Sequence, residues 1–444
     1  MCHRCFRMGG AVARCFLFNE CCGLIMSLSH IQGLAADTVS AVAQGRNLSD
    51  ELALLYAQHA GLPAQDRGML HDLAHGVQRF YGSLDFMLAR LLAKSPPPRV
   101  RALLLVAMYQ LQHTRNAPHA VVNEAVRHIG RIGKGRYRAL GNAVLRRFQR
   151  EMPALLAACA DDDVARYNLP VWWLGRLRRD YPDAWRQIAD DCSAHPPFTL
   201  RVNPRRSSVA AYLAELAADG IAATPLGGAA VMLAHALPVH KLGGFAEGRV
   251  SVQDFGAQRA AVLLAPQDGE RILDACAAPG GKSGHLLELA DCRLTALDIS
   301  PQRLARVADN LQRLGLTAQL HCADAANLPA WHDGVPFDAV LADIPCTASG
   351  TIRRNPDVRW LRRPDDAAKT AAQQIPLLDA LWHTVRPGGR MLLATCSLFR
   401  EENQDQCRNF LARHPDAVLQ HESILPPDTR QDGFYYALLH KSVA

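Results

Sequence analysis

The chain has 444 residues, of which 49% are hydrophobic and 20% are charged. At about 150 residues per domain this length allows two to three domains, and the composition excludes a disordered or fibrous protein. The formal net charge is +7, and no apolar run reaches the roughly 18 residues of a membrane span, so we expect a soluble, folded protein without a membrane segment.

The first 27 residues are rich in cysteine. They hold five of the 13 Cys, and the spacing of Cys2 and Cys5 is half of a zinc site, but no second pair follows at the spacing of a zinc finger. We therefore expect residues 1–27 to be an unstructured extension and predict no metal site. The eight other cysteines are scattered among strand-like segments, which favours free thiols in a reducing cytoplasm.

From residue 31 to about residue 150, apolar residues recur at helical spacing, and Gly and Pro fall mostly between the periodic segments. The pattern predicts an all-α domain over residues 28–150. Ser49 is a candidate N-cap of the second helix, and Pro118 stands at a helix start. The predicted helices cover residues 34–45, 50–60, 66–80, 84–93, 98–112, 118–129 and 136–150.

Positive charge is concentrated in this helical region. Residues 1–150 contain 19 Lys and Arg against 8 Asp and Glu, and residues 95–150 contain 11 Lys and Arg against one acid, Glu124. A charge run is usually a solvated face, but this one is too one-sided for solubility alone. It is typical of a surface that meets a polyanion, so we expect a nucleic acid partner.

Residues 151–250 read as a transition between two larger domains. A helical stretch carries Trp172, Trp173, Tyr181 and Trp185, and a strand-like segment at 198–203 precedes a helix at 208–219. This order predicts linker helices followed by a small α+β module. The aromatic residues either stack on bases or fill a core, and we favour the core.

From residue 251 to residue 444 the pattern changes to strands that alternate with helices, which is the signature of a doubly wound parallel sheet. The segment predicts a C-terminal α/β domain of Rossmann-like architecture. Expected strands cover residues 271–275, 293–298, 318–323, 338–343 and 390–395. Expected helices cover residues 283–290, 301–314, 366–385 and 400–413.

The first of these strands runs into a glycine turn, from Asp274 to Lys282, and a helix follows at once. Such a turn lets backbone N–H groups and a helix N-terminus approach a ligand. The segment is not a phosphate-binding loop, because Cys276 stands where that motif requires glycine, and the dinucleotide fingerprint is also absent. We expect a crevice for a nucleoside that carries no long phosphate chain.

Two acids stand at the ends of the next two strands. Asp298 lies where an acid in such folds accepts hydrogen bonds from ribose hydroxyls, and Asp324 lies where it would meet an adenine edge. Each acid alone has an ordinary reading as a cap or a surface residue, but two at successive strand ends favour a nucleoside site. S-adenosylmethionine, with ribose, adenine and a sulfonium but no phosphate, fits this pattern.

The fourth and fifth strands end near two thiols and a carboxylate, Cys346, Cys396 and Asp343. Neighbouring parallel strands would bring the three groups into one pocket. Cytosine C5 is too weak a nucleophile to take a methyl group until a thiolate adds at C6. Asp343, protonated or hydrogen-bonded near N3, would stabilise the resulting intermediate. The pattern leaves open which of the two cysteines is the nucleophile, since a free Cys also packs well in a core.

With these features the sequence resembles the NOL1/NOP2/Sun group of RNA cytosine-5 methyltransferases, from about residue 28 onward. The resemblance includes a helical domain similar to NusB, the cofactor loop and both thiol segments. The other matching segments are Thr199-Leu200-Arg201-Val202-Asn203, Val252-Gln253-Asp254, residues 349–357 and Asp432-Gly433-Phe434-Tyr435-Tyr436.

The resemblance implies roles that the residue pattern alone does not rank. It implies that Cys396 is the nucleophile and that Cys346 releases the product. It also implies 16S ribosomal RNA as the substrate. Nothing in the sequence demands more than a monomer. The implied cofactor contacts are Cys276, Ala277, Ala278, Pro279, Gly280, Gly281, Lys282, Asp298, Asp324 and Asp343.

Two alternatives stay open at this point. The same chemistry on transfer RNA is compatible with the catalytic residues, although a NusB-like domain favours ribosomal RNA. The chain could also be a noncatalytic RNA-binding factor of the antitermination type, with the second domain as a relic. Intact cofactor and thiol motifs argue against this second alternative.

Overall fold

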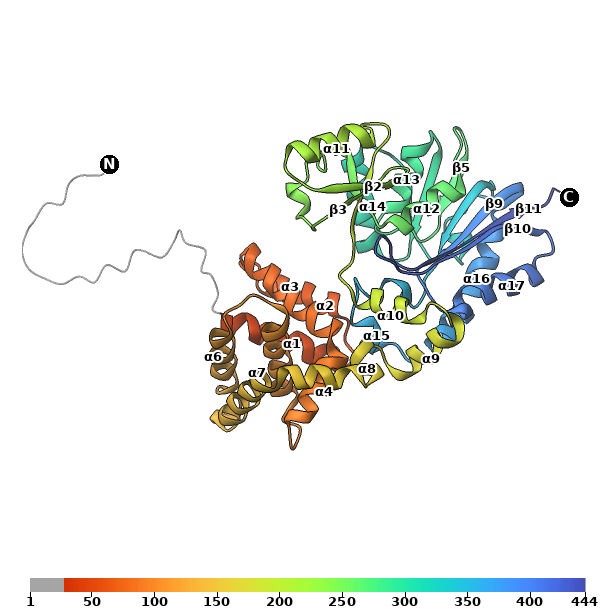
Figure 1. Ribbon diagram of the computed structural model, residues 1–444. Coiled ribbons are helices and arrows are strands. Elements are labelled where there is room, and N and C mark those ends of the chain that lie inside the picture. The colour runs from red at the N-terminus through yellow and green to blue at the C-terminus, as the bar shows by residue number, and fades with distance from the viewer. Residues whose placement is uncertain (1–27, 444) are drawn as a thin grey trace, which may run out of the picture.

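The structure is a computed structural model that describes residues 28–443 (Figure 1). The predicted N-terminal extension and the Cys2 and Cys5 pair lie outside these residues. A bundle of helices forms one end of the molecule, and a small sheet and a larger sheet form the other. In the described part of the chain no helix is both long enough and apolar enough to cross a bilayer.

The larger sheet has seven strands in the order β10-β11-β9-β8-β5-β6-β7, of which β9, β8, β5, β6 and β7 are parallel neighbours. The prediction of a Rossmann-like α/β domain is confirmed. The antiparallel hairpin of β10 and β11 was not predicted. The strands are β5 Arg271–Asp274, β6 Arg293–Asp298, β7 Gln319–Cys322, β8 Phe337–Asp343, β9 Val385–Thr395, β10 Ala417–Leu425 and β11 Phe434–Lys441.

Helices cover both faces of this sheet, as the alternation of strands and helices requires. The helices α12, α13 and α14 pack on one face, and α16 and α17 pack on the other. Each face has its own apolar layer, and both layers are closed to solvent. The helices are α12 Phe255–Leu264, α13 Gly281–Leu289, α14 Pro301–Leu314, α16 Asp366–His383 and α17 Gln404–Arg413.

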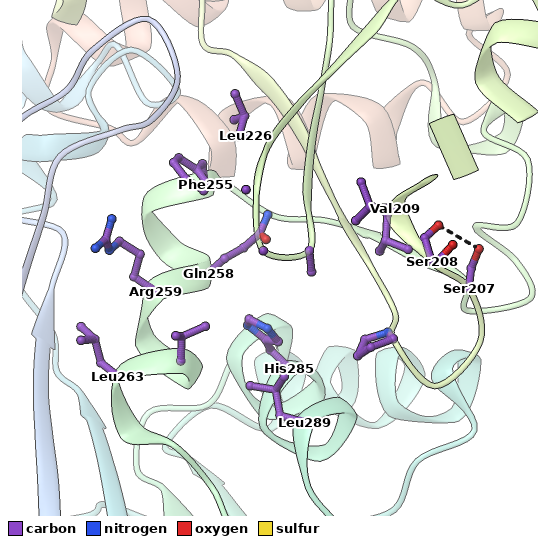
Figure 2. Close-up of a pocket in the computed structure, with 16 residues that line it drawn as sticks. Ser207, Ser208, Val209, Leu226, Phe255, Gln258, Arg259, Leu263, His285 and Leu289 are labelled. Carbon is purple, nitrogen blue, oxygen red and sulfur yellow. Dashed lines mark hydrogen bonds between the residues drawn. The ribbon is translucent and has the colours of Figure 1, made fainter. Parts of the chain in front are cut away.

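The predicted α+β module is an antiparallel sheet in the order β2-β3-β1-β4 with one helix, α11. Its elements are β1 Phe198–Val202, α11 Val209–Ala218, β2 Ala223–Gly227, β3 Ala230–Leu233 and β4 Val250–Val252. A buried ion pair joins it to the larger sheet's helices, because Arg201 Nε donates to Glu288 Oε2 at 2.7 Å. A cavity opens between the module, α12 and α13 (Figure 2).

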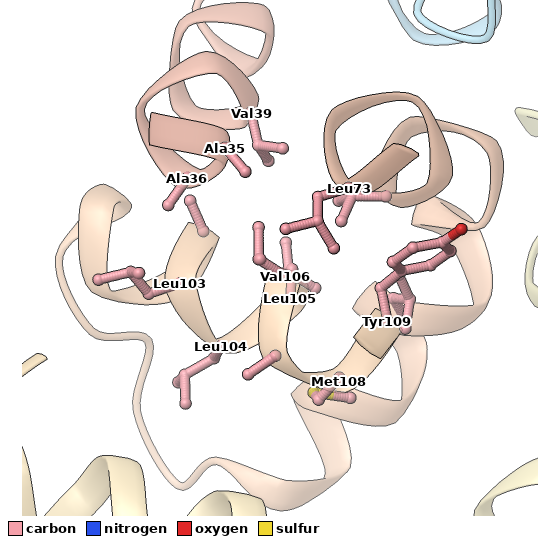
Figure 3. Packing of buried hydrophobic residues seen from close by; sticks show 14 of the residues in the cluster. Ala35, Ala36, Val39, Leu73, Leu103, Leu104, Leu105, Val106, Met108 and Tyr109 are labelled. Carbon is pink, nitrogen blue, oxygen red and sulfur yellow. The ribbon is translucent and has the colours of Figure 1, made fainter. Parts of the chain in front are cut away.

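The N-terminal bundle contains seven helices, as predicted. Its central helix, α5, is buried from Ala102 to Gln110 and packs against α1 and α3 (Figure 3). A helix that is apolar all round belongs in the centre of a bundle. The helices are α1 Leu28–Ala43, α2 Leu48–Gln58, α3 Ala64–Arg79, α4 Tyr81–Leu91, α5 Pro98–His113, α6 Pro118–Ile129 and α7 Arg138–Ala160.

The predicted cap of the second helix is wrong. Helix α2 begins at Leu48, and the side chain of Asn47 accepts hydrogen bonds from the backbone N–H groups of Ser49 and Asp50. Asn and Ser are equally good caps, so the residue type could not decide between them. Pro118 does stand at the start of α6, as predicted.

Three short helices connect the bundle to the module: α8 Asp163–Tyr167, α9 Val171–Asp180 and α10 Trp185–Ser193. Trp173 and Trp185 are buried in an apolar cluster that also contains Leu398 and Phe399 of the larger domain. The preference for a core role is confirmed for these two residues. Trp172 and Tyr181 are half-buried at the edge of the same cluster.

A short helix of the larger domain, α15 Val358–Leu361, ties that domain to the bundle. The fully buried guanidinium of Arg359 donates to the carbonyl oxygens of Arg79 and Cys192. The carboxylate of Asp357 accepts from the backbone N–H of Leu48 at 2.9 Å. The bundle therefore holds the segment that follows Cys346 in the chain.

Candidate active site

The two predicted thiols lie side by side at the carboxyl edge of the larger sheet. Strands β8 and β9 are parallel neighbours, with Asp343 in register with Ala394, so the segments that follow them leave the sheet together. The Sγ atoms of Cys346 and Cys396 are 3.5 Å apart. The expectation that these neighbouring strands bring the two thiols together is met by this distance.

The two thiols differ in their acidity. The hydrogen bond between the sulfurs and the burial of the pair raise the pKa of Cys346 well above its usual value. The same hydrogen bond, given by Cys346, lowers the pKa of Cys396, with help from the ammonium of Lys282 and against burial and the charge of Asp343. Cys396 is therefore the sulfur that more readily carries a negative charge, and the thiolate is the reactive form.

Asp343 accepts a hydrogen bond from Lys282, with 2.5 Å between Nζ and Oδ2. Lys282 lies in the first turn of α13. Burial alone would lower the pKa of this lysine, but its pairing with Asp343 outweighs burial and the pKa is raised. The lysine therefore stays charged and places a positive charge beside Asp343 and the thiols.

The glycine turn between β5 and α13 has the form expected of a ligand cradle. Gly280 has a φ of 94°, and a Cβ on it would lie 3.1 Å from Cα of Val307. Ala278 donates its N–H to Oδ2 of Asp298 at 3.3 Å, and Gly280 donates to the carbonyl of Ala277 at 2.7 Å. Of the other loop residues, Cys276 is half-buried, Pro279 is exposed and Gly281 begins the helix.

The acids around this turn suit a ligand that brings hydrogen-bond donors. Asp298 is buried at the end of β6, and Asp274 is fully buried at the end of β5, where its Oδ1 has no partner among the described residues. Asp324 lies two residues beyond Cys322, which pairs with Asp298, and is exposed. An orphaned carboxylate oxygen and a backbone cradle fit a nucleoside with hydroxyl and ammonium groups.

No cluster of three or more metal-ligating side chains occurs among residues 28–443.

Comparison with known proteins assigns each part of the chain. Residues 261–440 match the family described as 16S rRNA methyltransferase RsmB/F, residues 169–240 match its ferredoxin-like domain, and residues 29–150 match the NusB family. The ribosomal RNA small subunit methyltransferase B of Vibrio cholerae is 42% identical over 435 residues, which cover 95% of this chain and 99% of that protein. That of Sodalis glossinidius is 42% identical over 93% of this chain.

The chain belongs to the RsmB/F family of 16S rRNA methyltransferases.

Two solved structures share the fold of this RsmB/F chain. The crystal structure of PH0851 covers 93% of the chain with a TM-score of 0.75 and 24% identity. A methyltransferase homologue from Pyrococcus horikoshii covers 63% of this chain and 98% of its own, with a TM-score of 0.57 and 26% identity.

The RsmB/F site also contains a buried network that sequence reasoning missed. Glu402 is fully buried and accepts hydrogen bonds from the backbone N–H of Thr347 at 2.7 Å, from the hydroxyl of Thr347 at 2.6 Å and from the hydroxyl of Ser397. These two residues directly follow Cys346 and Cys396. One carboxylate thus joins the two thiol segments, and burial raises its pKa. In the sequence, each of the two cysteines is directly followed by a residue with a hydroxyl group. This repeated pair is the signal from which the network could have been predicted.

A second connection crosses the same region of the RsmB/F site. Gly350 donates its N–H to the carbonyl of Cys396 at 2.8 Å and accepts the N–H of Gly433 at 2.8 Å. A Cβ on Gly350 would lie 2.3 Å from the carbonyl oxygen of Gly433. The loop after Cys346 and the turn before β11 therefore touch backbone to backbone, which only glycine permits.

Proposed function

We propose that this protein methylates C5 of a cytosine in small-subunit ribosomal RNA, with S-adenosylmethionine as the methyl donor and a covalent bond between Cys396 and C6 of the base. The two thiols, 3.5 Å apart and close to the ion pair of Lys282 with Asp343, carry the proposal, because a nucleophile and a second thiol for its release would then meet one base. The lowered pKa of Cys396 supports its choice as the nucleophile. The names of the curated relatives support the ribosomal substrate.

The chemistry follows from the positions of three side chains. The Cys396 thiolate forms a bond to C6, and the electron pair of the C5–C6 double bond becomes available at C5, which then takes the methyl group. Asp343, paired with Lys282, accepts a hydrogen bond from the exocyclic amine of the base. A base then takes the C5 proton, the electron pair of that C–H bond re-forms the C5–C6 double bond, and the pair of the carbon–sulfur bond returns to Cys396. Cys346, whose sulfur is 3.5 Å away, would assist this release.

Bound S-adenosylmethionine would supply the methyl group as a good electrophile. We assign its contacts to the turn from Cys276 to Lys282, with Asp298 on the ribose hydroxyls, Asp324 near the adenine edge and Asp343 near the methionine end. The orphaned Oδ1 of Asp274 and the left-handed backbone at Gly280 support this assignment. The target cytosine would have to leave its stack to reach Cys396.

The basic face of the helical bundle would dock the RNA through phosphate contacts. Its exposed side chains lie in the loop after α5, around the short helix η1 Ile132–Gly135 and along α7, and several have no carboxylate partner among the described residues. The unpaired exposed members are Arg115, Arg131, Lys134, Arg136, Arg138 and Arg146.

The direct test incubates the protein with methyl-labelled S-adenosylmethionine and unmodified small-subunit RNA, followed by nucleoside analysis. We expect labelled 5-methylcytidine at one site. If the label appeared on transfer RNA instead, the result would support the thiol mechanism and contradict the assignment of ribosomal RNA as the substrate. If the protein bound RNA but transferred no methyl group to any RNA, the result would contradict an enzymatic function and favour a noncatalytic RNA-binding factor.

The two thiols have separable roles in this test. Cys396→Ala should abolish turnover by at least about 10³-fold while S-adenosylmethionine still binds, since the nucleophile is lost and the cofactor turn is intact. Cys346→Ala should trap a covalent enzyme–RNA complex that survives denaturing electrophoresis. Full activity of Cys396→Ala, or a trapped complex in Cys396→Ala rather than in Cys346→Ala, would contradict the assignment.

A further inference from the structure

A cavity of about 710 Å³ lies between the small module and the larger domain, away from the thiols (Figure 2). Figure 2 shows side chains of α12 on one side, the segment around Ser208 on the other, and His285 and Leu289 of α13 between them. Most of its walls are aliphatic or aromatic carbon, from Val202, Val209, Leu226, Phe255, Val262 and Leu263. Neither Cys346 nor Cys396 lines it.

One polar ring is buried in this apolar wall. His285 is 2% exposed, and its Nδ1 has no hydrogen-bond partner in residues 28–443. Burial, with a contribution from Arg201, holds the pKa of His285 well below its usual value. A neutral imidazole offers one donor and one acceptor nitrogen. A buried polar group without a partner is unusual and indicates that something else supplies the partner.

The charge around the cavity has one sign. Arg259 is the one ionised side chain that lines it, and none of the lining residues is acidic. Arg259 is exposed and makes no ion pair or hydrogen bond within the described chain. Val262 and Leu289, which also line the cavity, are 62% and 41% exposed. The opening therefore combines apolar surface with an uncommitted positive charge.

We propose that this cavity binds an unpaired nucleobase of the RNA substrate, distinct from the cytosine that enters the catalytic site. The inference rests on the proposed function, because it requires an RNA substrate. Apolar side chains and Phe255 fit the flat faces of a base, the imidazole of His285 fits its polar edge, and Arg259 fits the phosphate beside it. A purely aliphatic occupant would leave both polar groups without a partner.

The site extends RNA recognition beyond the helical bundle. Its walls come from the module on one side and from α12 and α13 on the other, so a base held there would link the two. Helix α13 also begins at the cofactor turn. A base in the cavity would fix where the neighbouring RNA strand meets the carboxyl edge of the larger sheet.

The test compares two glutamate substitutions at exposed valines. Val262→Glu places a negative charge at the mouth of the cavity, and Val418→Glu makes the same change on β10, where Val418 is 50% exposed and lines no described cavity. We expect Val262→Glu to raise the KM for small-subunit RNA by about tenfold, as for the loss of one stacked base. The kcat and the affinity for S-adenosylmethionine should stay unchanged, and Val418→Glu should behave as wild type.

Equal KM values for the two variants would overturn the proposal. So would a normal KM on protein-free RNA combined with a raised KM on a small-subunit assembly intermediate, because the occupant would then be a protein. Failure of the proposed function is distinct, since the wild-type protein would then methylate no small-subunit RNA.

A second measurement uses the wild-type chain and does not depend on a variant that folds. Small-subunit RNA that carries 4-thiouridine is crosslinked to the protein by light, and the attached peptides are identified by mass spectrometry. We expect crosslinks in residues 255–264 or 202–209. Crosslinks confined to the helical bundle and the thiol segments would overturn the proposal. His285→Phe, which keeps the ring and removes both nitrogens, should raise the KM without altering kcat.

Discussion

The geometry around Glu402 points to a positioning role for both thiols. Its carboxylate accepts hydrogen bonds from the residue after Cys346 and from the residue after Cys396, in a site that excludes water. The sulfurs keep their 3.5 Å separation because these segments are joined. A shift of about 1 Å in such a site costs about 10²-fold in rate.

We therefore predict that Glu402→Ala lowers kcat about 10²-fold and leaves the dissociation constant of S-adenosylmethionine unchanged. Glu402→Gln, which retains an acceptor for Thr347, should be affected less. The pH dependence of Cys396 alkylation should shift upward in Glu402→Ala, as the thiol pair separates. An unchanged alkylation profile alongside lost activity would indicate a folding defect instead of a positioning role.

Asp274 makes stability depend on pH. Burial raises its pKa from 3.8 to about 7, so the folded protein keeps a proton that the unfolded chain releases. The contribution of this group to the free energy of unfolding is most favourable below about pH 4, falls as the pH rises to about 7, and stays low above that value. The amide side chain in Asp274→Asn does not ionise, so this pH-dependent contribution to the free energy of unfolding is absent from the variant.

We predict that Asp274→Asn melts at a higher temperature than wild type at pH 8, in the absence of cofactor, and that the difference shrinks at pH 5. Thermal unfolding of both proteins at the two pH values checks this. The hydroxyl of Ser283, which donates to Asp274 at 2.6 Å, can donate equally to the amide oxygen. A difference that grows toward pH 5 would contradict the prediction.

Three residues of the thiol site could be predicted from the sequence, whereas Glu402 could not. Cys346, Cys396 and Asp343 could be brought together from sequence, because neighbouring parallel strands end at one edge. Glu402 could not, since it stands in the polar run from Arg400 to Asp405, which reads as a solvated segment. Only the tertiary position of that run buries the carboxylate.

At the scale of elements, two loops that cross at glycine hold the thiol region closed. A methyl group on Gly350 would meet the backbone of Gly433, which cannot move aside as a side chain can. We predict that Gly350→Ala lowers the melting temperature by several degrees and removes methyl transfer. Gly175→Ala in α9 is the matched control, because nothing lies within 4 Å of its added methyl group.

Gly175→Ala should be neutral or stabilising by up to about 1 kcal/mol, since alanine is the better helix former. Thermal unfolding and the methylation assay measure both variants. If the two alanine variants have equal melting temperatures, the contact between the loops does not constrain the fold.

Most elements could be predicted because their apolar residues repeat at a clear period. The predicted helix at 98–112 is α5 Pro98–His113, and the predicted strand at 293–298 is β6. The hairpin of β10 and β11 was not predicted because the residues of β10 are largely exposed. The strand therefore shows no alternation of buried and exposed positions. The cavity beside α12 could not be predicted because its walls come from four separate segments of the sequence.

For the whole molecule, the proposed docking of RNA depends on the distribution of charge. Arg131, Arg138 and Arg146 are exposed on the bundle and have no carboxylate partner within residues 28–443. Each phosphate that an arginine neutralises releases counterions, so binding weakens with salt.

We predict that replacing all three by Gln weakens binding of small-subunit RNA and lowers the slope of log K against log salt by about 1 for each arginine that meets a phosphate. Binding isotherms at several salt concentrations measure the slope. Methyl transfer at saturating RNA should be unchanged, since the thiols are elsewhere. An unchanged slope would exclude this face of the bundle as the docking surface.

The contact between Gly350 and Gly433 has a consequence for the timing of synthesis. The turn that closes the thiol region is translated after both cysteines. Beside this turn, the buried carboxylate of Asp432 accepts hydrogen bonds from Arg353 and Arg354, which lie in the loop that follows Cys346. A growing chain thus carries the cofactor turn and both thiols while the site is still open. A chain that stops before Asp432 would therefore lack the contact that joins the loop after Cys346 to the turn before β11.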